Sequence, residues 1–295
     1  MNLKLHMVYK PYFKIWTGWL LLSCLLLFSG LYANPSPNRV IIIGTKHNGN
    51  KMLTVKSMYN AINRINPDLI LMELDSTIIT NCSINKVWGA QTAEWLGIWK
   101  NPIEYRAVRK YQKKNKQVCI SPFDVFIPNR KTYIAYHQAM EKSHQETLSK
   151  VYQQGLMNNS ESAEYEKYSE INNAFMQLLD SSLIQMNRST LTDTIENILY
   201  KEKHFIRRLT LQNPALQPFG NWYNAQLDFW DERSAAMNKK IWDQLNANSN
   251  KTIVIITGLL HKAEIENFLQ KKEMVDLCKL ITLESALSNP PVPDF

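Results

Sequence analysis

Two short motifs with the same residues at the same spacing could do chemistry in this chain. Each places a histidine three residues after a glycine, so that Gly44 precedes His47 and Gly258 precedes His261. With 9 glycines and 6 histidines in 295 residues, chance predicts roughly 0.2 such pairs. Imidazole binds transition metals and acts as an acid or base near neutral pH. The repeated motif therefore predicts one shared functional site, and the alternative is two unrelated structural histidines.

A carboxylate completes the predicted site. Glu73 directly follows an apolar run. Two imidazoles and a carboxylate suit a divalent metal such as Mn, Co or Zn, which would activate water and polarise a carbonyl. We therefore expect His47, Glu73 and His261 as metal ligands, and His47 and Glu73 as catalytic residues. Without a metal, the two histidines and Glu73 would act as general base, partner acid and electrostatic stabiliser.

Purely structural roles for these residues are the alternative. Glu73 could cap a helix or lie at the surface. Asp124 follows a third apolar run, where it could be a ligand, an orienter of one histidine, or an ordinary loop residue.

Four apolar runs predict the strands that must position these residues. The runs cover residues 40–43, 69–72, 117–120 and 252–257, and each is followed by one of the polar residues above. Helical periodicity between them predicts βαβ units, which imply a parallel sheet. Ligands bind outside the carboxyl ends of such strands. We therefore expect an α/β fold with a mainly parallel central sheet, flanked by helices at 55–65, 105–116, 222–245 and 263–271.

Residues 129–213 contain no proline and a single glycine, so they predict a helical insertion. The aromatic cluster of Trp222, Tyr223, Phe229 and Trp230 has helical spacing and is expected to be core or pocket wall, or else to line an apolar substrate groove. His137 and His144 share a helical face without a pair of carboxylates. They are expected to be structural.

These motifs resemble those of the TraB/GumN/Tiki superfamily, which is distantly related to the erythromycin esterase and ChaN-like proteins. The resemblance rests on residues 44–47, on residues 67–73, on the Arg-bearing segment 232–237 and on residues 258–261. It implies Arg233 as a further catalytic residue, a fixed cation for a carboxylate, for an oxyanion or for holding Glu73. A surface ion pair is the alternative for Arg233. It implies one α/β domain over residues 34–295 with a helical insertion. It also implies metal-dependent proteolysis for Tiki-like members, whereas other relatives are metal-free esterases or haem-binding lipoproteins.

The sequence and the resemblance together predict an exported, metal-dependent hydrolase of peptide or ester bonds. The alternative is a non-catalytic capture or regulatory protein that binds haem, a metal or a short peptide in the same pocket. The expected partner is a peptide or a small molecule. Nucleic acid is not expected, because the formal charge of +8 falls to +5 from residue 34 onward and the basic residues are scattered among acids.

Residues 1–33 predict a secretory signal. Three lysines precede a leucine-rich stretch over residues 20–31, which ends near Ala33 at a tolerable cleavage site. An uncleaved signal anchor is the alternative. Either way, the body of the protein is expected to be exported, either periplasmic or secreted, and to meet a membrane only through this segment.

Three cysteines follow this segment: Cys82, Cys119 and Cys278. Their odd number and the absence of a Cys-x-x-Cys pair make a disulfide framework unexpected. Three buried free cysteines are the expectation, and one disulfide with one free thiol is the alternative.

Overall fold

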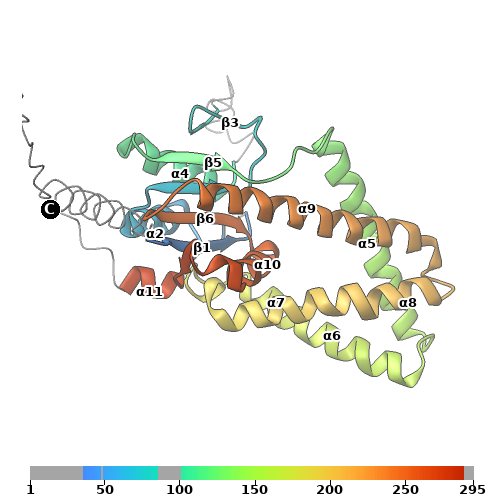
Figure 1. The fold of residues 1–295 in the computed structure, drawn as a ribbon. Helices are drawn as coiled ribbons and strands as arrows, with labels where there is room; N and C mark the ends of the chain where they lie inside the picture. Colours follow the sequence, from blue (N-terminus) through green and yellow to red (C-terminus); the bar gives the residue numbers. More distant parts are fainter. Residues whose placement is uncertain (1–35, 48, 86–100, 289–295) are drawn as a thin grey trace, which may run out of the picture. The chain divides into compact units, whose positions relative to one another are not determined.

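The computed structural model describes residues 36–47, 49–85 and 101–288 (Figure 1). The predicted signal or anchor segment, residues 1–33, lies outside them. The described residues from 37 onward form one compact unit. Within the described ranges, no helix combines the length and the apolar character needed to cross a bilayer.

Five parallel strands form the central sheet, in the order β5-β2-β6-β1-β7. The central strands consist of consecutive buried aliphatic residues because both faces of the sheet are covered. The predicted α/β fold with a mainly parallel sheet is therefore confirmed. The strands are β1 (Asn38–Thr45), β2 (Leu69–Met72), β5 (Cys119–Pro122), β6 (Thr252–Gly258) and β7 (Cys278–Leu280).

Alternate residues of β1 enter the two hydrophobic layers on either side of the sheet, as the pleat requires. Ile41 and Ile43 pack with α2 (Val55–Ile65), α4 (Ile103–Lys114) and α11 (Leu283–Ser288). Val40 and Ile42 pack with α9 (Gly220–Asn246) and α10 (Leu259–Leu269).

The helical block expected over residues 129–213 extends to one side of the sheet (Figure 1). Its helices are α5 (Arg130–Gln153), α6 (Asn159–Leu178), α7 (Ser189–Lys201) and α8 (Arg207–Gln212), with a 3-10 turn η1 (Gln185–Asn187) and a π-helical turn η2 (Glu202–Ile206).

Two features join the block to the sheet. Helix α9 runs from the block to the sheet, with Tyr223 in the core of the block and Ile241 against the strands. The Asn187 side chain accepts a hydrogen bond from the Gly44 N–H and donates one to the Gly44 carbonyl, at 2.7 and 3.0 Å. The end of β1 is therefore fixed by the block.

Some element boundaries differ from those expected. The strand predicted at 117–120 lies at 119–122, and α10 begins directly after Gly258 rather than at residue 263. His261 therefore lies in the first turn of a helix. The hairpin of β3 (Ile79–Thr80) and β4 (Ser83–Ile84), the edge strand β7 and the helix α11 were not predicted, because such short elements have too few residues to show a period.

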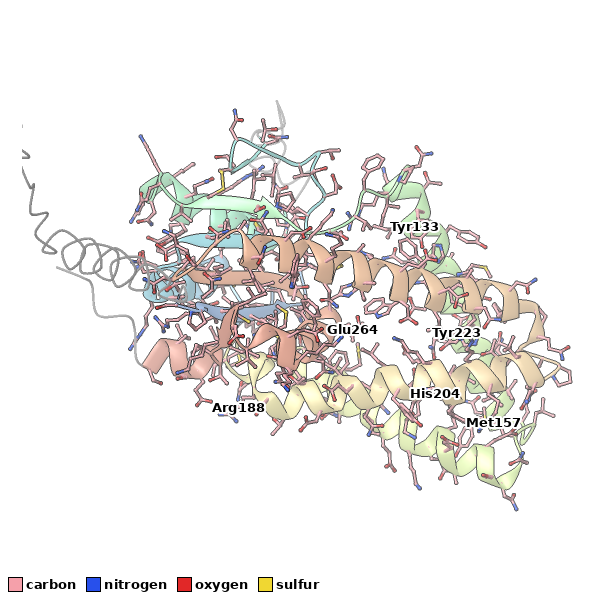
Figure 2. All side chains as sticks on the ribbon, in the orientation of Figure 1. Tyr133, Met157, Arg188, His204, Tyr223 and Glu264 are labelled. Carbon is pink, nitrogen blue, oxygen red and sulfur yellow. A yellow bond between two sulfur atoms is a disulfide. The ribbon has the colours of Figure 1, made fainter. Side chains whose placement is uncertain are left out.

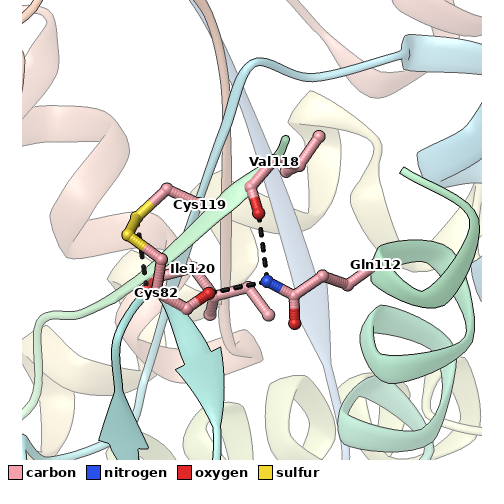
Figure 3. The surroundings of a disulfide bond; sticks show 5 residues. All are labelled: Cys82, Gln112, Val118, Cys119 and Ile120. Carbon is pink, nitrogen blue, oxygen red and sulfur yellow. Dashed lines mark hydrogen bonds between the residues drawn. A yellow bond between two sulfur atoms is a disulfide. The ribbon is translucent and has the colours of Figure 1, made fainter. Parts of the chain in front are cut away.

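The expectation of three free cysteines is wrong. Cys82 and Cys119 form a disulfide between the β3–β4 hairpin and the start of β5, and Cys278 is a buried free thiol. The Gln112 amide donates hydrogen bonds to the carbonyls of Cys82 and Val118, at 2.6 and 3.0 Å (Figure 3). The turn around the disulfide is thus also held by α4.

Candidate functional site

Arg233 is the centre of the candidate site. From α9 its guanidinium makes a bidentate contact with Asp124, with Nε and Nη2 donating at 2.8 and 2.9 Å. Nη2 also donates to Oε1 of Glu73 at 2.6 Å, and Nη1 donates to Nε2 of His261 at 2.9 Å. Four of the five N–H groups of the guanidinium are thus engaged. Arg233 is no surface ion pair, since its side chain is only 12% exposed.

Glu73 lies directly after β2 and is held on both carboxylate oxygens. Besides the Arg233 contact at Oε1, Oε2 accepts hydrogen bonds from the Thr257 hydroxyl at 2.8 Å and the Gly258 N–H at 2.7 Å. Burial opposes ionisation, yet the Arg233 guanidinium and the Gly258 amide hold the pKa of Glu73 below its ordinary value. Glu73 is therefore a fixed carboxylate at the carboxyl ends of β2 and β6.

Asp124 is fully buried after β5 and touches neither predicted histidine. It accepts hydrogen bonds from Arg233, from Arg130 at 3.0 Å and from the Val125 N–H at 2.7 Å. Burial raises the pKa of Asp124, but the Arg233 guanidinium outweighs it and the pKa lies below its ordinary value. Asp124 thus positions Arg233, a role distinct from ligand or histidine orienter.

Neighbouring side chains fix both the tautomer and the orientation of the His261 ring. Arginine only donates, so Nε2 accepts and the neutral ring carries its proton at Nδ1. The Trp230 indole stacks on the imidazole at 4.0 Å between centroids and 8° between planes. Trp230 and Ser234 of α9 both donate to Glu264 of α10, which is labelled in Figure 2. Oε2 of Glu264 is 3.6 Å from Nδ1 of His261.

His47 is the accessible member of the cluster, with 51% of its side chain exposed. Nδ1 lies 2.5 Å from Oε1 of Glu104, which is buried in the first turn of α4. Burial lowers the pKa of His47, but Glu104, helped by Glu73, raises it above the ordinary value. His47 also adopts a left-handed backbone with φ of 63°, a conformation that is uncommon outside glycine and recurs at functional sites.

The two motif glycines allow close approach rather than a left-handed turn. A Cβ on Gly44 would lie 2.7 Å from Leu259 Cδ2, so the absence of a side chain lets α10 pack on β1. A Cβ on Gly258 would lie 3.3 Å from Nε2 of His47 and 3.5 Å from Oε2 of Glu73. His47 and Glu73 therefore flank the same point above Gly258, and the structure brings all four predicted residues into one cluster.

Glu104 is the functional residue that the sequence interpretation missed. The sequence does place a carboxylate on an apolar face of this helix, since Glu104 lies on the same face as Ala107, Val108 and Tyr111. That pattern could have indicated a buried carboxylate. A buried carboxylate at such a position needs a polar partner. Its Oε2 has no hydrogen-bond partner among the described residues.

The arrangement does not fit the predicted metal triad. Arg233 donates hydrogen bonds to Nε2 of His261 and to Oε1 of Glu73. The His261 nitrogen and the Glu73 oxygen are 3.9 Å apart. A metal bound by both would have to displace the guanidinium from its buried carboxylates. Within residues 36–47, 49–85 and 101–288, no three His, Cys, Asp or Glu residues are grouped to hold a metal ion. Binding of Mn, Co or Zn stays a prediction.

No family model, curated protein or solved structure matches this chain. The resemblance to the TraB/GumN/Tiki superfamily therefore stays a prediction that rests on its motifs alone.

Proposed function

We propose that this protein is an exported hydrolase of ester or peptide bonds that uses His47 as its general base. One observation carries the proposal. A half-exposed imidazole is held at Nδ1 by the buried Glu104, while its Nε2 lies near Glu73 above Gly258. Such a pairing of an accessible histidine with a buried orienting carboxylate is the arrangement that general-base catalysis requires.

Glu104 would fix the proton of neutral His47 at Nδ1, because a carboxylate at 2.5 Å accepts that hydrogen bond. The lone pair of Nε2 is then free to take a proton from a water molecule as the water attacks a carbonyl carbon. Glu104 and Glu73 both favour the imidazolium that forms. The same proton would later pass from His47 to the leaving group.

Glu73 and Arg233 would act by charge rather than by proton transfer. Both oxygens of Glu73 are already held by donors, which suits an ionised carboxylate that stabilises protonated His47. Arg233 has one N–H at Nη1 that is not engaged by Glu73, Asp124 or His261. We assign this N–H to the oxyanion that forms on the attacked carbonyl.

Two further features support the proposal. The resemblance to a superfamily with metal-free esterases agrees with a site in which an arginine lies between the predicted ligands. The Cys82–Cys119 disulfide supports export, because disulfides persist in oxidising compartments. The ligand we propose is a peptide or a small molecule with an ester or amide bond.

Hydrolysis of chromogenic esters and of a peptide library tests this proposal. We expect turnover by the purified protein that survives a chelator, and a loss of about 100-fold or more in His47→Ala, the usual range for a general base. His204→Ala is the matched control, because His204 is exposed on η2. Undiminished turnover in folded His47→Ala would contradict the proposal. No turnover, together with a Soret band after haem addition, would favour ligand capture instead.

A further inference from the structure

A cavity of about 200 Å³ lies in the helical block, beside the candidate site but outside the His47 cluster. It is bordered by α5, the end of α7, η2, α9 and the start of α10. Aromatic and aliphatic side chains form much of its wall, including Trp222, Tyr223, Leu227 and Trp230. In Figure 2, Tyr223 extends from α9 toward α7 and α8. The space and the apolar wall suit a small organic ligand.

Two carboxylates, Glu141 and Glu202, line the same cavity. Glu202 is the first residue of the π-helical turn, and π-turns are frequent at functional sites. Its Oε1 accepts a hydrogen bond from the Tyr168 hydroxyl at 3.1 Å. Burial, with repulsion from Glu141, raises the pKa of Glu202 to about 7. A cation between the two carboxylates would relieve this repulsion.

Two buried polar atoms of the cavity lining have no hydrogen-bond partner in the described parts of the chain. They are Nδ1 of His144, whose side chain is fully buried, and Oε1 of Gln226. Buried polar groups are nearly always paired, so each of these two atoms lacks a partner that such a group normally has. The amide oxygen of Gln226 can only accept, and therefore needs a donor.

Lys203 is the basic residue in the cavity lining, and it already forms ion pairs with other carboxylates. Lys203 points its ammonium to Asp231 at 2.5 Å and to Glu264 at 3.5 Å. It therefore leaves the two carboxylates of the cavity without full compensation.

We propose that this cavity binds a small protonated amine with an apolar body. The ammonium N–H groups would donate to Glu202, Glu141 and Oε1 of Gln226, and the positive charge would also be attracted by the faces of Trp222 and Tyr223. The apolar body would pack on Leu227 and Trp230. Trp230 also stacks on His261, so the two sites share one wall. The inference concerns binding and does not depend on the proposed hydrolysis.

Calorimetric titration of the full chain with 2-phenylethylamine, compared with 2-phenylethanol, tests the proposal. The two probes have nearly the same shape, and only the amine is charged at neutral pH. We expect the amine to bind at least roughly tenfold more tightly than the alcohol. Equal affinity, or no heat from either probe at millimolar concentration, would overturn the proposal.

Glu202→Gln removes the charge and keeps an acceptor for Tyr168, so the fold should be retained. We expect it to weaken amine binding by roughly tenfold or more and to leave alcohol binding unchanged. The matched control is Glu196→Gln, six residues earlier on α7 and outside this cavity. Amine binding that is equally strong in Glu202→Gln would show that the cavity is not the amine site. Trp222→Leu, with its unfolding temperature measured alongside, gives an independent check on the aromatic wall.

Discussion

At the scale of single residues, the candidate site depends on one buried guanidinium. Arg233 compensates Glu73 and Asp124, and both carboxylates lie within the protein, at 9% and 0% side-chain exposure. Removing one partner of a buried ion pair leaves an uncompensated charge, which costs far more than the pair contributes.

We therefore expect Arg233→Met to lower the free energy of unfolding by about 3–5 kcal/mol. Denaturant unfolding followed by circular dichroism measures it. Lys239→Met is the control on the same helix, since Lys239 is exposed and pairs only with Asp243 in the described structure. That control should change stability by less than about 1 kcal/mol. Similar losses in both variants would show that the guanidinium is not the centre of the cluster.

Residue types and spacing were sufficient to predict His47, Glu73 and His261 as one cluster, because each follows a predicted strand, and the family resemblance added Arg233. Their roles could not be predicted. The contact of Arg233 with His261 and Glu73 depends on how α9 crosses the sheet, which periodicity does not specify. Glu104 was missed because its position on a helix does not show that its side chain will contact the loop that carries His47.

At the scale of elements, the two Gly-x-x-His motifs have the same sequence pattern but different structural requirements. Gly44 lies within β1, where α10 packs on the strand, whereas Gly258 precedes α10 and faces the exposed His47 ring.

We expect Gly44→Ala and Gly258→Ala to have different consequences. The first would place a Cβ 2.7 Å from Leu259 and 2.9 Å from Lys262, both buried, so overpacking should cost about 1–3 kcal/mol of stability. In Gly258→Ala the new Cβ would contact the His47 ring, which can move into solvent. This variant should therefore reduce hydrolysis with little loss of stability. Unfolding and turnover measured on both variants check this. A larger loss of stability in Gly258→Ala would contradict it.

The long buried strands and helices were predictable, because β-branched runs such as residues 252–257 and the stripe over residues 55–65 have clear periods. The start of α10 was placed four residues late, because Gly258 was expected to begin a loop. The β3–β4 hairpin was missed, and with it the pairing of Cys82 with Cys119, since cysteine spacing does not report which segments meet in space.

At the scale of the whole molecule, a disulfide joins the edge strand β5 of the sheet to the β3–β4 hairpin. Cys82 and Cys119 are 37 residues apart, and Cys119 begins the strand that leads to Asp124. The cross-link therefore restricts the unfolded chain over a long loop and secures the strand that positions Arg233.

From this loop length we expect the double variant Cys82→Ser/Cys119→Ser to lose about 4 kcal/mol of unfolding free energy. Denaturant unfolding of the wild type with and without a reductant should show a similar difference. The double variant is the control, because a reductant should leave its stability unchanged. Equal stability of the oxidised and reduced wild type would show that the disulfide does not form or does not contribute.

The most direct measurement is an NMR titration of isotope-labelled histidines in the full chain, with His47 assigned by its absence in His47→Ala. We predict that His47 titrates above 6.5, because Glu104 and Glu73 favour its charged form. Below 6.5 this charged form adds to stability, and the contribution is lost as the pH rises through the raised pKa. In Glu104→Gln the His47 pKa should fall. A His47 pKa at or below 6.5, or one that Glu104→Gln leaves unchanged, would contradict a general base held by a buried carboxylate.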